Sequence, residues 1–155
     1  MSEEQGSAPG TGQVNWIRMV RRLEAPPERA FRAWSDPEEM QRWLPERIEG
    51  SLAAGTRSVL VWREERVPVD VGEVQAHSSF TYRRAWPSAS EVVTTTRLTF
   101  VPVGYGSRVE VEDGPFDLDL PGGLEAWGKA VEWWAVTLTT LRAHLDFSVD
   151  LRYSR

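Results

Sequence analysis

Four polar side chains stand at alternate positions of two segments that have the composition of strands. Tyr82 and Arg84 lie in "SFTYRRAW", and Thr94 and Thr96 lie in "EVVTTTRLTFVP". Alternate residues of a strand share one face of the sheet, so each pair points the same way. A few polar groups in an otherwise apolar pocket orient a bound ligand. With Trp134 of a later segment facing them, these residues predict a site for a small molecule.

Arg84 has the strongest need for a partner. A buried, unpaired guanidinium costs several kcal/mol, so it requires a carboxylate from the protein or from a ligand. Glu73, on the neighbouring expected strand, is the candidate within the chain. Alternatively, Arg84 lies beyond the mouth of the pocket and its side chain extends to water. The sequence leaves both interpretations open.

The other polar motifs do not predict a catalytic or metal centre. The two histidines are His77, in an expected turn, and His144, near the end of a long expected helix where a cation suits the dipole. An acidic run lacks the glycine and the final glutamate of a calcium loop, so we interpret it as a solvated strand edge and loop. This run comprises Glu110, Glu112, Asp113, Asp117 and Asp119. "VGYGS" leads into a strand and predicts a hairpin turn, not a phosphate site. We therefore predict no catalytic residue, no metal and no cofactor.

A strand and two short helices begin the framework that positions these residues. "WIRMVRRLEA" mostly alternates apolar and polar residues and predicts a strand. "PPERAFRAWS" has proline in its first turn and predicts a short helix. Asp36 is then expected to cap a second helix, with Pro37 first and Glu39 third, as in a capping box. The faces predicted to point inward hold Trp34, Met40 and Trp43.

Most of the remaining chain predicts strands followed by one long helix. Residues 56–64, 69–76, 79–86, 91–102 and 107–113 are rich in β-branched and aromatic residues, and 47–50 is a further short candidate. Short segments between them, such as "EERVP" and "PSAS", predict turns and hence antiparallel neighbours. From 124 to 147 apolar residues recur every three or four positions, which is typical of an amphipathic helix. This order predicts an α+β fold, in which a curved antiparallel sheet of about six to seven strands wraps the helix and leaves a cavity.

Composition restricts the class of protein. The 155 residues fit one domain, and a net charge of -5 argues against nucleic-acid binding. The absence of cysteine excludes disulfides and thiolate chemistry. No apolar run suits stable membrane insertion and no signal-peptide pattern is present, so we expect a cytoplasmic protein. We expect a flexible tail over 1–13, a single domain over 14–147 and a C-terminal tail over 148–155.

Three motifs occur in an order that is typical of a known superfamily. The first is "APPERAFRAWSDPEEMQRWL", the second is "GEVQAHSSFTYRRAW", and the third is Trp134 followed by leucines four and seven residues later. Together they resemble the START-like or SRPBCC superfamily, which has the helix-grip fold and is also called birch-pollen-allergen-like. More narrowly, they resemble the stand-alone bacterial form of the branch named after the activator of heat-shock protein 90 ATPase. "REERVPVD" departs from the family pattern, so no ligand contact is inferred from that hairpin.

The resemblance implies that a small hydrophobic molecule, such as a lipid, polyketide or aromatic metabolite, binds between the sheet and the long helix. The predicted cavity-lining residues are Trp34, Met40, Trp43, Val59, Val61, Phe80, Tyr82, Arg84, Thr94, Thr96, Leu98, Val109, Val111, Trp127, Val131, Trp134 and Leu138. Within this set, a Trp134→Arg variant is expected to lose binding while the fold survives.

Several alternatives stay open at this point. The tryptophans could fill the cavity completely, in which case no ligand would bind. A binding module is favoured over an enzyme, but a cyclase or dehydratase acting on such a molecule is an alternative. So is a chaperone-linked module that interacts with another protein. A homodimer and a chaperone partner are the partners left open besides the ligand.

Overall fold

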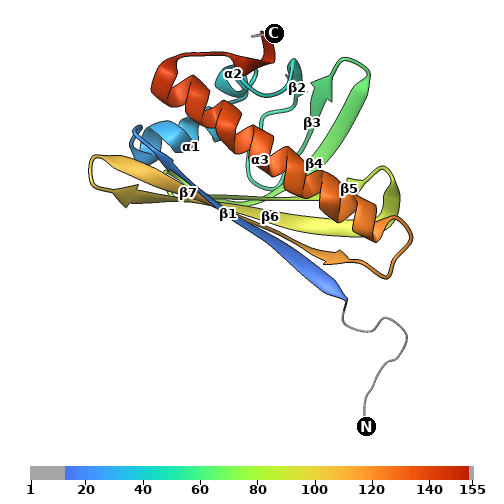
Figure 1. The fold of residues 1–155 in the computed structure, drawn as a ribbon. Helices are drawn as coiled ribbons and strands as arrows, with labels where there is room; N and C mark the ends of the chain where they lie inside the picture. Colours follow the sequence, from blue (N-terminus) through green and yellow to red (C-terminus); the bar gives the residue numbers. More distant parts are fainter. Residues whose placement is uncertain (1–12, 154–155) are drawn as a thin grey trace.

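The computed structural model describes residues 13–153 and contains a single seven-stranded antiparallel sheet with one long helix across it (Figure 1). The strand order is β1-β7-β6-β5-β4-β3-β2. The strands are β1 Val14–Leu23, β2 Arg47–Glu49, β3 Arg57–Trp62, β4 Glu65–Gln75, β5 Ser79–Trp86, β6 Ala89–Val103 and β7 Gly106–Asp117. The helices are α1 Pro27–Ser35, α2 Pro37–Met40, α3 Gly123–Phe147 and the 3-10 helix η1 Leu151–Tyr153. The predicted α+β architecture is confirmed, while the tail predicted for 1–13 lies almost wholly outside the described residues.

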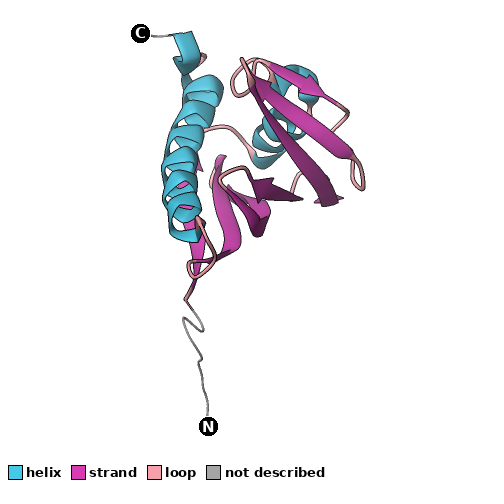
Figure 2. Cartoon of the chain, turned by 90° about the vertical axis from the view of Figure 1, so that its right-hand side faces the viewer, coloured by secondary structure: helices cyan, strands magenta, loops and turns pink. Residues whose placement is uncertain are grey.

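The long helix α3 covers only one half of the curved sheet. It packs mainly against β1, β7 and β6, and the β3–β4 hairpin stands apart from it on the other side of the molecule (Figure 2). Small residues on its buried face, Ala126 and Ala130, let the helix approach the sheet closely, and Trp134, Leu138 and Leu141 continue that face. The open side between α3 and β3–β5 is where the candidate site lies.

The short helices α1 and α2 close one end of the sheet. Pro27 occupies the first turn of α1, and the Asp36 carboxylate accepts a hydrogen bond from the Glu38 backbone N–H, which caps α2. The predicted capping box is wrong, because Glu39 does not reach back to Asp36. Its carboxylate is buried and binds Arg29 of α1 and His144 of α3 instead.

Three strand boundaries differ from the predicted ones. "EERVP" is not a turn, because β4 already starts at Glu65 and runs through Pro68, which is paired with Val59 of β3. The proline removes one backbone donor, but Val67, Val69 and Val71 alternate with exposed residues and are buried, which keeps the strand in the sheet. Likewise β6 begins at Ala89 inside "PSAS", and β7 continues past 113 to Asp117.

The segment after α3 folds back on the domain. The Arg152 guanidinium donates to the Pro45 carbonyl at 2.8 Å, between α2 and β2, and also binds Asp150. The described part of the segment predicted as a C-terminal tail is therefore anchored at its η1 turn. None of the helices in the part of the chain described here has the length and apolar character that crossing a bilayer requires.

Candidate functional site

Strand register brings four polar side chains into neighbouring rows across the inner face of the sheet. Tyr82 of β5 pairs with Thr96 of β6, and Thr96 pairs with Asp113 of β7. In the next row, Arg84 pairs with Thr94. The predicted grouping of tyrosine, arginine and two threonines on one face is therefore what the structure contains, with an aspartate added to it.

Asp113 is the centre of a buried hydrogen-bond network. It is 1% exposed, accepts from the Trp134 indole N–H at 2.9 Å and accepts from the Thr96 hydroxyl at 3.0 Å. The Trp86 indole N–H donates to Thr94 at 3.1 Å, and Thr94 in turn hydrogen-bonds Asp113. Burial raises the pKa of the Asp113 carboxyl, although the hydrogen bonds from Trp134, Thr96 and Thr94 act in the opposite direction.

The burial of Asp113 corrects the prediction that it belongs to a solvated acidic edge. Val109 and Val111 face inward, so a further step of two along β7 also faces inward. The same alternation that identified the two valines could therefore have identified Asp113. Glu110 and Glu112 lie on the outer face, where they pair with Arg108 and Arg18, as a solvated edge requires.

Stacked tryptophans fill most of the space beneath α3. The Trp34 ring centroid lies 5.8 Å from that of Trp134 and 5.7 Å from that of Trp43, and Tyr82 stacks on Trp34 at 6.4 Å. What is left is a cavity of about 20 Å³. This is room for about one water molecule, which needs roughly 10–15 Å³. The sequence left open whether the interior holds an open cavity or is filled by tryptophans. The structure is close to the filled interior.

Some of the residues that line the small cavity were predicted from the sequence, and others were not. Five predicted residues line it, namely Trp34, Met40, Phe80, Tyr82 and Arg84. Six further residues were not predicted, namely Leu52, Leu60, Trp62, Val67, Val69 and Trp133. Val67 was missed because Pro68 suggested a turn, and Trp133 because it lies one position off the apolar stripe of α3. The indole N–H of Trp34 is buried without a hydrogen-bond partner among the described residues.

Val59 and Val61 do not line the cavity, which corrects their prediction. Leu60 and Trp62 of the same strand do, so alternation places the two valines on the opposite face. Val61 is nevertheless buried there, and Val59 is half-buried. When both faces of a strand are apolar, the sequence does not show which set of alternate residues points inward.

The other predicted lining residues belong to the packed interior. Trp43, Leu98, Val109, Val111, Trp134 and Leu138 are core residues, and Trp127 and Val131 pack at the edge of the core. Thr94 and Thr96 belong to the Asp113 network. Because Trp134 is 1% exposed and hydrogen-bonded to Asp113, a Trp134→Arg substitution would disturb folding, contrary to the expectation from sequence.

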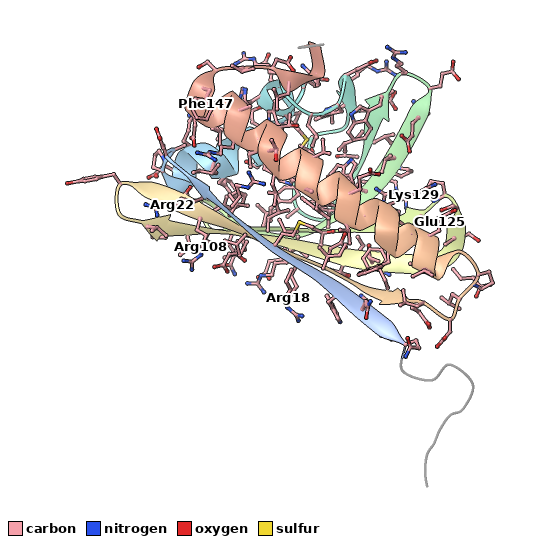
Figure 3. The ribbon with its side chains drawn as sticks, in the orientation of Figure 1. Arg18, Arg22, Arg108, Glu125, Lys129 and Phe147 are labelled. Atoms are coloured by element: carbon pink, nitrogen blue, oxygen red, sulfur yellow. The ribbon has the colours of Figure 1, made fainter. Side chains whose placement is uncertain are left out.

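An open groove lies directly outside the small cavity, between α3 and β3–β5. Its volume is about 640 Å³. Trp62, Val67, Arg84 and Trp133 line both the cavity and the groove. The groove alone is lined by Glu65, Trp86, Pro87, Ser88, Lys129, Glu132 and Val136. Lys129 and Glu125 lie one turn apart on α3 (Figure 3), with their charged atoms 3.9 Å apart.

Arg84 lies at the boundary between cavity and groove. Its guanidinium carbon is 3.8 Å from the centroid of the Trp86 ring, and its Nε donates to the Ala85 carbonyl at 3.2 Å. No carboxylate of residues 13–153 lies within ion-pair distance of it, and the exposed Glu73 interacts with Gln75 instead. Burial lowers the pKa of the Arg84 guanidinium, opposed by Tyr82, Asp113 and Glu65. Arg84 is therefore half-buried at the mouth, neither paired with Glu73 nor fully in water.

The histidines and acidic residues do not assemble into a metal site. His77 lies in the β4–β5 turn, in contact with the Phe31 ring, and His144 binds Glu39. Over residues 13–153, no three histidine or acidic side chains converge in a way that could hold a metal ion.

Solved structures with this arrangement of a curved sheet and a long helix show which fold the chain has. Protein MLL2253 from Mesorhizobium loti superposes with a TM-score of 0.76 at 21% identity, covering 85% of this chain and 97% of that one. The Aha1 dimer from Colwellia psychrerythraea gives a TM-score of 0.74 at 15% identity, covering 86% and 97%. DynU16, from the dynemicin biosynthetic locus, gives 0.76 at 16% identity, covering 89% of this chain and 49% of that one. The chain thus has the helix-grip fold.

The sequence itself identifies the family. A model of the family described as Activator of Hsp90 ATPase homolog 1-like protein matches residues 24–146. The chain belongs to this family, as the three sequence motifs predicted. A comparison with curated proteins found no match.

Proposed function

We propose that the protein binds a small hydrophobic molecule in the groove between α3 and β3–β5. The observation that carries this proposal is the groove of about 640 Å³, which shares Trp62, Val67, Arg84 and Trp133 with the small apolar cavity beside it. Ligand pockets commonly measure about 300–1,000 Å³ and combine apolar walls with a few polar groups.

Aromatic side chains support this choice of ligand. The groove is lined by the half-buried Trp62 and Trp133, whose rings offer large rigid apolar surfaces at low entropic cost, and by the edge of the buried Trp86. Because the interior retains only about 20 Å³, the ligand binds mainly in the groove.

The enzyme alternative has less support. A reaction would need a titratable group with a shifted pKa in contact with the ligand. The pKa of Tyr82 is raised by burial and by Asp113, so its phenol stays protonated at neutral pH and does not supply a phenolate base. Asp113 lines neither the cavity nor the groove.

Native mass spectrometry of protein purified from its host tests the proposal. We expect a bound small molecule that survives purification, or a rise in the melting temperature with some of an offered set of lipids and aromatic metabolites. Recovery of bare protein only, together with no thermal shift from any compound, would contradict binding.

Two α3 variants locate the site without disturbing the core. Val136 is 61% exposed and lines the groove, whereas Leu124 is 63% exposed and does not. We expect Val136→Arg to weaken ligand binding about tenfold or more, because a long charged side chain enters an apolar surface. Leu124→Arg is the matched control and should bind as the unmodified protein does. Equal binding by both variants would exclude the groove.

A further inference from the structure

We propose that the ligand carries a single carboxylate, attached to an aromatic ring system, and that this carboxylate pairs with the guanidinium of Arg84. This inference rests on the proposed function, because it names the chemistry of a molecule bound in the same groove. Among residues 13–153, Arg84 is the half-buried cation that lies on the inner face where the small cavity meets the groove.

Arg84 differs from the other arginines of the described residues in being half-buried while its guanidinium has no hydrogen bond or ion pair to another side chain. Nine of them lie within ion-pair distance of a carboxylate, namely Arg18, Arg29, Arg32, Arg47, Arg57, Arg66, Arg108, Arg142 and Arg152. Arg21 donates to the Thr139 hydroxyl. Arg22, Arg42, Arg63, Arg83 and Arg97 are exposed, where water satisfies them. Arg21 is half-buried as Arg84 is, but it has the Thr139 hydroxyl as a partner. In residues 13–153, only Arg84 is both partly withdrawn from water and without a hydrogen bond or ion pair to another side chain.

The guanidinium of Arg84 is held in position for an incoming anion. It lies 3.8 Å above the Trp86 ring, which restricts its plane, and only its Nε has a hydrogen bond, to Ala85. The terminal nitrogens donate to no residue in the described part of the chain. Two parallel N–H groups match the two oxygens of a carboxylate. Burial beside Trp86 strengthens such a pair relative to one in water.

The surrounding charges favour one negative charge over two. Glu65 and Glu132 also line the groove, and Lys129 is the only other cation there among the described lining residues. Lys129 already lies 3.9 Å from Glu125. A dianionic phosphate would meet these carboxylates with insufficient positive charge to balance it. A monoanion on a flat apolar body fits both the single free guanidinium and the tryptophan walls.

A pair of probes that differ only in charge tests the inference. 2-Naphthoate and its neutral amide, 2-naphthamide, have the same ring system and nearly the same shape. We expect the unmodified protein to bind the acid about tenfold or more tightly than the amide, as measured by calorimetry at neutral pH. In Arg84→Gln this preference should fall to about one, with amide binding changed by less than about threefold.

Two further variants control for charge and for geometry. Arg83→Gln removes an exposed arginine from the opposite face of the same strand and should leave the preference unchanged. Arg84→Lys retains the charge but loses the two-pronged geometry, so it should keep part of the preference. Arg84→Lys also serves as the working variant if Arg84→Gln does not fold.

Each outcome separates this inference from the proposed function. If acid and amide bind equally, or if Arg84→Gln retains the preference, the inference is wrong while hydrophobic binding stands. If neither probe binds at millimolar concentration, the carboxylate site is absent, and the mass spectrometry and thermal-shift experiment then decides the proposed function separately.

Discussion

Glu39 links three helices through one buried carboxylate. It accepts hydrogen bonds from Arg29 of α1 and from the His144 ring of α3, the latter at 2.9 Å, and Arg32 lies 3.5 Å from its other oxygen. Burial raises the pKa of Glu39, but the hydrogen bonds from His144 and Arg29 outweigh it, so the net pKa is lowered. The ionised form is therefore stabilised in the folded protein.

Replacing Glu39 by glutamine should destabilise the protein in a pH-dependent way. We expect a loss of about 2 kcal/mol at pH 7, typical of a hydrogen bond to a charged group. Because the pKa of Glu39 is lower in the folded state, its contribution is complete above the ordinary value of 4.5 and is lost as the pH falls towards the folded pKa. Urea unfolding of both proteins at pH 7 and at pH 3 measures this convergence.

Glu38→Gln is the matched control for this experiment. Glu38 is the neighbouring residue, is exposed, and forms no ion pair within the described chain. Its substitution should change the free energy of unfolding by less than about 0.5 kcal/mol at either pH. A Glu39→Gln effect that is the same at both pH values would mean that ionisation of Glu39 does not stabilise the fold.

At the residue scale, sequence periodicity predicted faces but not partners. Tyr82, Thr94 and Thr96 share the inner face as predicted, because alternation along a strand determines it. That Glu73 does not pair with Arg84 was not predictable, since Glu73 lies within a register shift in β4 that alternation does not reveal. The role of Glu39 was also missed, because an N-terminal glutamate fits a capping box equally well and its partner His144 is 105 residues away.

At the scale of elements, α3 starts at Gly123, where there is no room for a side chain. A Cβ atom on Gly123 would lie 2.0 Å from the Asp117 carbonyl oxygen at the end of β7. This contact lets the chain turn directly from the last strand into the helix that covers the sheet. Gly128, five residues further along α3, has open space where a Cβ atom would lie.

The same substitution at these two glycines should have opposite effects. Gly123→Ala should lower the free energy of unfolding by about 2 kcal/mol or more, because the clash is with backbone. Gly128→Ala should raise it by about 0.5–1 kcal/mol, since alanine favours the helical conformation. Chemical denaturation measures both. Similar effects of the two substitutions would show that β7 and α3 do not meet as described.

Element order was predictable and strand ends were not. Long apolar periodicity identified α3 to within one residue at its start, and short turns identified the antiparallel sheet. The start of β4 was misjudged because the rule that proline interrupts strands was outweighed by burial of Val67 and Val69. The inward face of β3 was undetermined because both of its faces are apolar.

At the scale of the molecule, one core connects all parts of the described chain. Buried residues of the sheet, of α1 and of α3 form a single cluster that includes Trp34, Leu98 and Leu138. A domain with one core is expected to unfold in one cooperative step. The filled interior makes this core tight, since side chains leave little unoccupied space.

Circular dichroism in the far and in the near ultraviolet should therefore report the same unfolding transition. We expect far-ultraviolet and near-ultraviolet signals to have coincident urea midpoints, because backbone and side-chain packing are lost together. Leu98→Ala, at 0% exposure, should lower the free energy of unfolding by about 3 kcal/mol and shift both midpoints equally. Val20→Ala, at 58% exposure, is the control and should shift neither. Separate midpoints would contradict a single core.

The contact between Trp133, which lines the groove, and Trp134, which lies in the core, also couples the two regions optically. Their rings lie 4.7 Å apart, and Trp134 is 5.8 Å from Trp34, which is 5.7 Å from Trp43. At such separations excitation energy passes from one indole to the next, so these four tryptophans emit as a coupled set. Light absorbed in the buried core can therefore be emitted or quenched at the groove, and the intrinsic fluorescence of the protein reports the state of that surface.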